Sequence, residues 1–176
     1  MSWSLDYQPA KEATRLEHFF SVSGRALYLA SSFELKCREI LRIVKLHHHY
    51  DETNDWSASM ALSRALRGKM LSEIIRQLKL LTEIQESDIS TLEKAKTARN
   101  FIAHELGALS PISSIFASSI EERLDTLSEH LPDLAAGDNL ISVWLYEYSE
   151  KEPAPYGIQK EYAGWVQRWV FSGKHT

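Results

Sequence analysis

The sequence predicts an all-α fold, an up-and-down bundle of four to five core helices with a C-terminal helical extension. Apolar residues recur every three or four positions through most of the chain, which is the period of an amphipathic helix. The 176 residues include only 7 Gly and 5 Pro, too few for the many turns of a sandwich or barrel. The length fits a single domain with a core over about 9–136 and an appendage over about 137–176.

The longest apolar stripe predicts a first long helix over about 24–49. Its members are Leu27, Ala30, Phe33, Cys37, Ile40, Leu41 and Val44. A shorter helical piece is expected to begin near Pro9, because proline is favoured in a first helical turn, and to end in a break at 21–24. A polar turn at 51–55 then leads into a second helix over about 57–83.

Two further helices complete the predicted core. The third is expected over about 90–106, where Ser90 and Glu93 have the spacing of a capping box and Gly107 follows the last turn. The fourth is expected over about 112–135.

The C-terminal part has a different character. Pro132 is expected to kink or shorten the fourth helix, and a turn is expected at 137–139. The segment 140–148 is rich in β-branched and aromatic residues and fits either a helix or a strand. A second break at 152–157 precedes a short amphipathic helix over about 158–170.

Composition excludes several classes of protein. The net charge is −4, whereas a protein that coats duplex DNA usually carries an excess of basic residues. Cys37 is the sole cysteine, which excludes an internal disulfide framework and a cysteine-based zinc site, and its position on an apolar stripe favours a core residue over a nucleophile. Residues 1–6 contain neither the basic region nor the apolar core of a signal peptide, so we expect none, and no run approaches the ~20 apolar residues of a membrane helix. We therefore expect a cytoplasmic protein without a membrane partner.

The third helix carries one feature that packing alone does not explain. Arg99 lies on the apolar seam of its own helix, whose other members are Leu92, Ala95, Ile102, Leu106 and Leu109. An arginine there must extend into solvent, pair with a carboxylate, or face a cleft or a partner. Asn100 and His104 are four residues apart and share a second face of the same helix.

The string Ala98-Arg99-Asn100-Phe101-Ile102-Ala103-His104-Glu105 resembles the signature of the HEPN superfamily. That signature is an arginine followed by a polar residue, with a histidine four to six residues after the arginine. Arg42 also precedes histidines at this distance, but only Arg99 is followed by Asn. HEPN domains are all-α bundles that typically act as dimers with a composite cleft. Many are metal-independent endoribonucleases of toxin–antitoxin, phage-defence and RNA-processing systems, whereas others have lost catalysis and serve as binding or scaffold modules.

The resemblance implies a catalytic role for three residues, and the chemistry of RNA cleavage suits them. The 2′-hydroxyl beside the scissile phosphate is the nucleophile, so the enzyme must accept a proton, donate a proton and stabilise negative charge. His104 would move protons, because histidine titrates near neutrality. Arg99 would bind the phosphate, because arginine stays charged and can grip two of its oxygens. Asn100 would orient His104 or hold a phosphate or the ribose.

We therefore expect a metal-independent endoribonuclease that leaves 2′,3′-cyclic phosphate ends and needs no cofactor. RNA is its expected substrate, the active form is expected to be a homodimer with a composite active site, and an antitoxin or regulatory protein is a further expected partner. One alternative is a catalytically silent HEPN-like module that binds a protein or nucleotide. Another is a structural adaptor in which Arg99 pairs with a buried glutamate and His104 caps the helix end.

The spacing of the two principal residues poses a geometric question. Arg99 and His104 project about 140° apart on an ideal α-helix. The arginine must therefore extend around the helix, the helix must distort, or the two residues must act across a dimer.

Other patterns allow two interpretations each. The basic residues Arg64, Arg67 and Lys69, with Arg76 and Lys79, either follow an RNA backbone or form an ordinary solvated face. The consecutive residues 47–49 are histidines that diverge by about 100° per position on a helix and cannot share one metal ion; they indicate a cationic cluster at a helix C-terminus instead. The C-terminal aromatic residues either stack bases or pack against the bundle; they are Trp144, Tyr146, Tyr148, Trp165 and Trp169.

Overall fold

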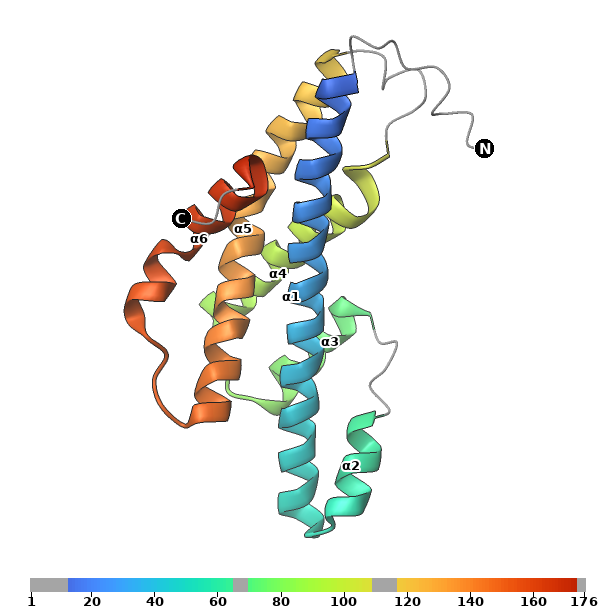
Figure 1. Ribbon diagram of the computed structural model, residues 1–176. Helices are drawn as coiled ribbons and strands as arrows, with labels where there is room; N and C mark the ends of the chain where they lie inside the picture. Colours follow the sequence, from blue (N-terminus) through green and yellow to red (C-terminus); the bar gives the residue numbers. More distant parts are fainter. Residues whose placement is uncertain (1–12, 65–69, 109–116, 174–176) are drawn as a thin grey trace.

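The computed structural model describes residues 13–64, 70–108 and 117–173, and within these ranges it contains helices and turns but no strand. It is an all-α helical bundle, as the sequence predicts (Figure 1). The elements are α1 (Ala13–Thr53), α2 (Trp56–Arg64), α3 (Leu71–Leu81), α4 (Glu86–Asn100), the π-helix η1 (Phe101–Glu105), α5 (Ala117–Glu150) and α6 (Tyr156–Ser172). No helix of the described ranges is both long enough and apolar enough to cross a membrane.

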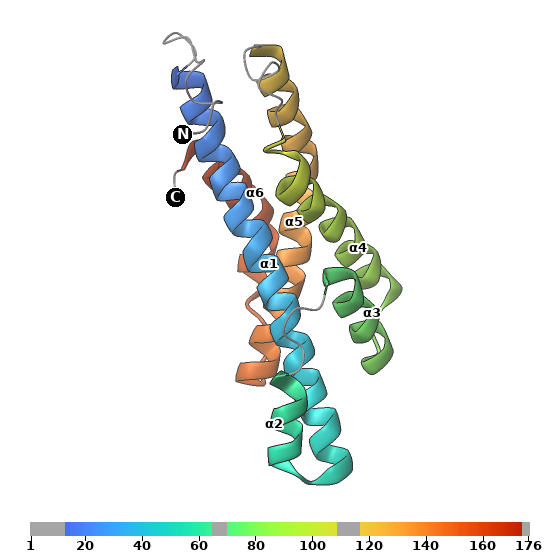
Figure 2. The same ribbon diagram turned by 90° about the vertical axis from the view of Figure 1, so that its right-hand side faces the viewer.

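The two long helices, α1 and α5, form the frame of the molecule. They pack against each other, and α4 contacts both of them as it crosses the bundle (Figures 1 and 2). The short α2 folds back on the C-terminal end of α1, whereas α6 folds back on α5 and also contacts α1. The core lies between these helices; its largest fully buried side chains include Phe19, Phe33, Leu41, Leu92, Leu127, Leu131 and Leu134.

The first helix differs from the prediction in two ways. It runs without interruption through the break expected at 21–24, because Val22 and Ala26 continue its buried face on either side of Gly24. Leu27, which was placed on the buried stripe, is 47% exposed. Ala26 and Ala30 take the buried positions there, so Leu27 is turned to the side of the helix.

The second and third predicted helices also have different limits. The single helix expected over 57–83 is interrupted, because Met70 has an extended backbone and α3 begins only at Leu71. The third helix begins at Glu86, which places Ser90 inside α4 and makes the predicted capping box wrong. Carboxylates at Glu86 and Asp88 occupy the first turn of α4, where they suit the positive end of the helix dipole.

The turn expected at 137–139 is wrong, because α5 continues through it and through Pro132 to Glu150. The limit expected between core and appendage therefore falls inside a helix, and the ambiguous segment 140–148 is helical. Gly137 is required for packing instead. A Cβ atom there would lie 2.2 Å from the Cβ of Ala95 and 3.2 Å from the ring of Phe33, so the glycine allows α5 to approach α4 and α1 closely. The predicted break at 152–157 is confirmed in part, since α6 begins at Tyr156.

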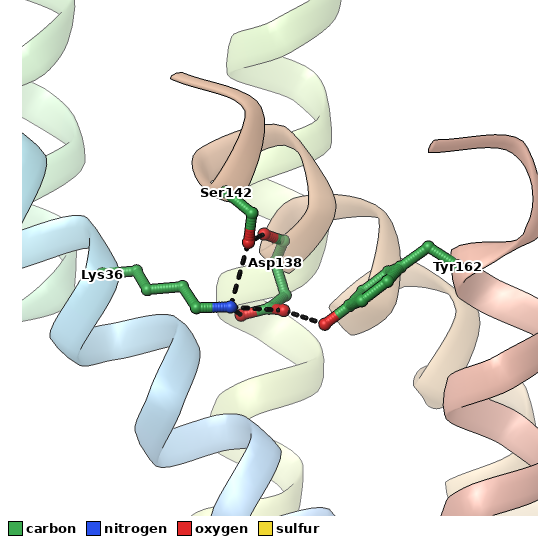
Figure 3. Close-up of polar contacts among 4 residues, drawn as sticks. All are labelled: Lys36, Asp138, Ser142 and Tyr162. Carbon is green, nitrogen blue, oxygen red and sulfur yellow. Dashed lines mark hydrogen bonds and ion pairs between the residues drawn. The ribbon is translucent and has the colours of Figure 1, made fainter. Parts of the chain in front are cut away.

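A buried polar network joins α1, α5 and α6 (Figure 3). Asp138 of α5 has no exposed surface, and the Nζ of Lys36 lies 2.9 Å from both of its carboxylate oxygens. Lys36 also donates to the hydroxyl of Ser142 at 2.9 Å, and the hydroxyl of Tyr162 donates to Asp138. A buried carboxylate needs such partners, because an unpaired charge in the core is costly.

Candidate active site

The sequence motif lies where α4 changes into a π-helix. Arg99 and Asn100 are the last two residues of α4, and His104 lies in η1. The N–H of Leu106 donates to the carbonyl of Phe101 at 2.9 Å, an i→i+5 bond that widens the turn. This wider turn brings Nη1 of Arg99 to 3.4 Å from Nε2 of His104. Of the three solutions the spacing allowed, the structure shows a distorted helix.

Packing explains why the helix widens at this point. Phe101 and Leu106 are both buried although they are five residues apart, and a regular α-helix would point them about 140° from each other. The ring of Phe101 also stacks on His130 of α5, with 4.7 Å between ring centroids. The π-turn lets Phe101 and Leu106 both face the core while His104 remains exposed. This five-residue spacing of apolar side chains is a signal that the sequence contained.

Three acceptors hold the guanidinium of Arg99. Nη1 donates to the side-chain oxygen of Asn100 at 3.0 Å and contacts His104, and Nη2 donates to the carboxylate of Glu34 on α1. Since a guanidinium only donates, Nε2 of His104 must be the acceptor, which puts the proton of the neutral imidazole on Nδ1. The lone pair of Nε2 therefore points toward Arg99 and accepts its hydrogen bond.

The structure shows one feature of the adaptor alternative, the ion pair of Arg99 with a glutamate. Arg99 does pair with a glutamate that is 13% exposed, Glu34. His104, however, contacts Arg99 instead of standing apart from it, and both side chains line one open cleft.

Arg38 is a member of the cleft that sequence reasoning missed. It donates through Nη2 to the other carboxylate oxygen of Glu34, so this glutamate bridges two arginines. The Nε of Arg38 is buried and has no hydrogen-bond partner among the residues described. The only signal in the sequence was the i,i+4 spacing of Glu34 and Arg38, which many helix surfaces share.

The cleft has a volume of about 510 Å³, within the size range of small-molecule sites. It lies between α1, the start of α3 and the α4–η1 junction, and its lining residues are Glu34, Arg38, Met70, Leu71, Ser72, Lys96, Arg99, Asn100, His104 and Glu105. Three of these are basic and two are acidic, apart from His104, which gives a local charge of 3 − 2 = +1. The cleft is thus more positive than the chain, whose net charge is −4.

The predicted basic face does not form one continuous helix surface. Arg67, Lys69 and the side chain of Arg64 lie outside the described residues. Arg76 and Lys79 are on α3, where Arg76 pairs with Glu73 and Lys79 lies 3.8 Å from Glu86. The interruption of the second helix separates these two from Arg64 at the end of α2.

The remaining candidates have structural partners. Cys37 is fully buried, and burial raises the pKa of its thiol far above the ordinary value, so it is not poised as a nucleophile. The three consecutive histidines contact three different residues: His47 the ring of Tyr148, His48 the carboxylate of Glu52 and His49 the hydroxyl of Ser59. No group of side chains suited to a metal ion occurs in the part of the chain that the structure describes.

The aromatic residues near the C-terminus divide between two environments. Trp144 and Trp169 pack against the core, whereas Tyr146, Tyr148 and Trp165 are exposed.

No protein-family model, curated protein or solved structure matches the chain significantly. The interpretation of the cleft accordingly depends on its own geometry and on the HEPN-like string.

Proposed function

We propose that the chain is a metal-independent endoribonuclease of the HEPN type, acting in a toxin–antitoxin or phage-defence setting. The observation that carries this proposal is the 3.4 Å contact between Nη1 of Arg99 and Nε2 of His104 in an open, locally positive cleft. A π-turn at a motif of this kind adds support, because such turns occur frequently at functional sites.

In the proposed reaction, phosphate oxygens of the RNA take the place of the acceptors that now hold Arg99. The arginine then neutralises the charge that develops on phosphorus, and Nε2 of His104 is released to accept the proton of the 2′-hydroxyl. The 2′-oxygen forms a bond to phosphorus while the bond to the 5′-oxygen breaks. A second acid protonates that leaving oxygen, and the products are a 2′,3′-cyclic phosphate and a 5′-hydroxyl.

The need for a second proton-transfer group favours a homodimer. His104 is the one histidine among the residues that line the cleft. A two-fold dimer would bring a second His104 to a composite site. Exposed apolar side chains on α1 offer a surface for it: Phe20, Leu27, Tyr28 and Leu35 are 47–69% exposed, and Leu35 adjoins Glu34 of the cleft.

The test is RNA cleavage in the presence of EDTA by the wild-type chain, Arg99→Ala and His104→Ala, with identification of the product ends. Matched controls are Arg168→Ala and His48→Ala, which remove exposed side chains of the same types outside the cleft. We expect cyclic-phosphate ends from the wild type and both controls, and loss of cleavage in the two cleft variants. Full cleavage by His104→Ala would falsify the proposal.

One observation favours a second candidate, a catalytically silent binding module. The carboxylate of Glu34 already accepts a hydrogen bond from the guanidinium of Arg99, which a phosphate would need. This arrangement suits a cleft that binds a ligand without cleaving it. This candidate predicts that a protein or a nucleotide binds and that the Arg99→Ala variant loses binding, while no variant or RNA yields cleavage products.

A further inference from the structure

A second cavity lies apart from the Arg99 cleft, between α1, the end of α3, the start of α4 and the C-terminal part of α5. Its volume is about 380 Å³, within the range of small-molecule sites. Buried apolar side chains form its floor, among them Ile40 of α1 and Leu78 of α3. The half-buried indole of Trp144, on α5, lines another part of the wall. None of the residues that line this cavity also lines the Arg99 cleft.

The charge of this cavity is entirely of one sign. The carboxylates that line it are those of Glu83, Asp88 and Glu147, and no lysine, arginine or histidine lines it. Within the part of the chain that the structure describes, no basic side chain forms an ion pair with any of the three. The lining therefore presents negative charge without a basic side chain beside it, which favours a bound cation.

The combination of an apolar floor, an aromatic wall and an acidic rim selects a particular ligand chemistry. A phosphate or an RNA strand would be repelled by the three carboxylates. A simple metal ion has no apolar surface that could cover the floor of the cavity. An ammonium group on an apolar body satisfies both parts, because the charge meets the carboxylates while the body covers the floor and contacts the indole.

We propose that this cavity is a binding site for a small organic amine with an aromatic or aliphatic body. The site is independent of the nuclease proposal, because it shares no lining residue with the cleft of Arg99 and His104. Glu83 and Asp88 bind the ammonium group together with Glu147, and Trp144 contacts the apolar body.

The experiment is calorimetric titration of the full chain with phenethylamine at low ionic strength, alongside its neutral analogue 2-phenylethanol. We expect saturable binding of the amine and affinity for the alcohol that is weaker by about tenfold or more. In proton NMR spectra, the indole N–H resonance of Trp144 should shift on titration with the amine. This resonance is identified by its absence in Trp144→Phe. Absence of saturable binding, or equal affinity for amine and alcohol, overturns the proposal.

Variants locate the site. The double change Glu83→Gln and Asp88→Asn keeps size and shape and should weaken amine binding by about fivefold or more. Glu86→Gln is the matched control, since this exposed glutamate lies between the other two in sequence but does not line the cavity. Circular dichroism confirms that each variant keeps its helices. An unchanged affinity in the double variant, or an equal loss in the control, overturns the assignment.

Discussion

At the scale of single residues, Glu34 sets how much positive charge the cleft presents. Its two carboxylate oxygens accept hydrogen bonds from Arg38 and Arg99, which keeps both cations in place and also neutralises part of their charge. Glu34→Gln removes one negative charge from the cleft and retains an acceptor of the same shape. We expect the Kd for a single-stranded RNA oligonucleotide, measured by fluorescence anisotropy, to fall by about threefold or more.

Glu39→Gln is the control for this change. Glu39 lies on the same helix and pairs with Arg42, but it does not line the cleft. The difference between the two variants should shrink as salt is added, because ions screen the attraction. Unchanged or weaker RNA binding by Glu34→Gln would contradict the assignment of this cleft to phosphate.

Two further residues, Cys37 and Tyr162, should make the stability of the folded protein sensitive to alkaline pH. Burial, and to a smaller extent the charge of Asp138, raises the pKa of both the Cys37 thiol and the Tyr162 hydroxyl above their ordinary values. The folded protein thus keeps protons that the unfolded chain releases. The resulting stability is fully present below about pH 8.5 and is lost progressively as the pH rises above the ordinary values.

Urea unfolding between pH 7 and 10.5 measures this effect. The free energy of unfolding of the wild type should fall as the pH rises through this range, and the fall should be smaller in the double variant Cys37→Ala and Tyr162→Phe. Tyr146→Phe, which alters an exposed tyrosine, should behave as the wild type does. Equal slopes in wild type and double variant would show that these two groups do not carry the pH dependence.

The residues of the site differ in how far the sequence revealed them. Arg99, Asn100 and His104 lie within six positions, so their local pattern was visible. Glu34 and Arg38 come to Arg99 from another helix, and Glu34 is 65 positions from Arg99 in the sequence. Their pairing depends on how α1 packs against α4, which no local pattern contains.

At the scale of elements, Gly137 allows α4, α5 and α1 to pack closely. In Gly137→Ala the new Cβ would lie 2.2 Å from the Cβ of Ala95. The alanine side chain is a single methyl group and cannot rotate out of the way. The helices must separate, at a cost of about 1–3 kcal/mol in the free energy of unfolding. Chemical denaturation measures this loss, and Ala95→Gly in the same chain should recover part of it.

Gly24→Ala is the matched comparison. This glycine is also inside a helix, but no neighbouring atom lies within 4 Å of the position of its Cβ. Alanine is the better helix former, so the variant should gain about 0.5–1 kcal/mol. A Gly137→Ala variant that matched or exceeded the stability of the wild type would show that close packing does not require this glycine.

The ends of the helices show where prediction from apolar periodicity fails. Apolar periodicity identified the helical class and most of the core, because burial follows the helical period. It misplaces the break at Gly24 and the turn at Gly137, because glycine is typical of turns but both flanks continue a buried face at these positions. The π-turn at 101–105 was not located because the assumed period was that of a regular α-helix.

At the scale of the whole molecule, the proposed dimer depends on the exposed face of α1. Leu27 and Leu35 are 47% and 61% exposed although they are large and apolar, and they lie on the same helix as the cleft residues Glu34 and Arg38. A second copy packed there would cover these side chains and stand beside the cleft of the first. The apolar face and the missing second proton-transfer group would then have one common explanation.

The double variant Leu27→Glu and Leu35→Glu tests this arrangement. Light scattering coupled to gel filtration should report a dimer for the wild type and a monomer for the variant, because four carboxylates would meet at a two-fold interface. Leu80→Glu is the control, since this leucine on α3 is 68% exposed but lies off α1, and this variant should stay dimeric. A monomeric wild type, or a dimer in all three proteins, contradicts the interface. Loss of the dimer with full RNA cleavage would instead contradict the composite site, because a single chain would then supply both proton transfers.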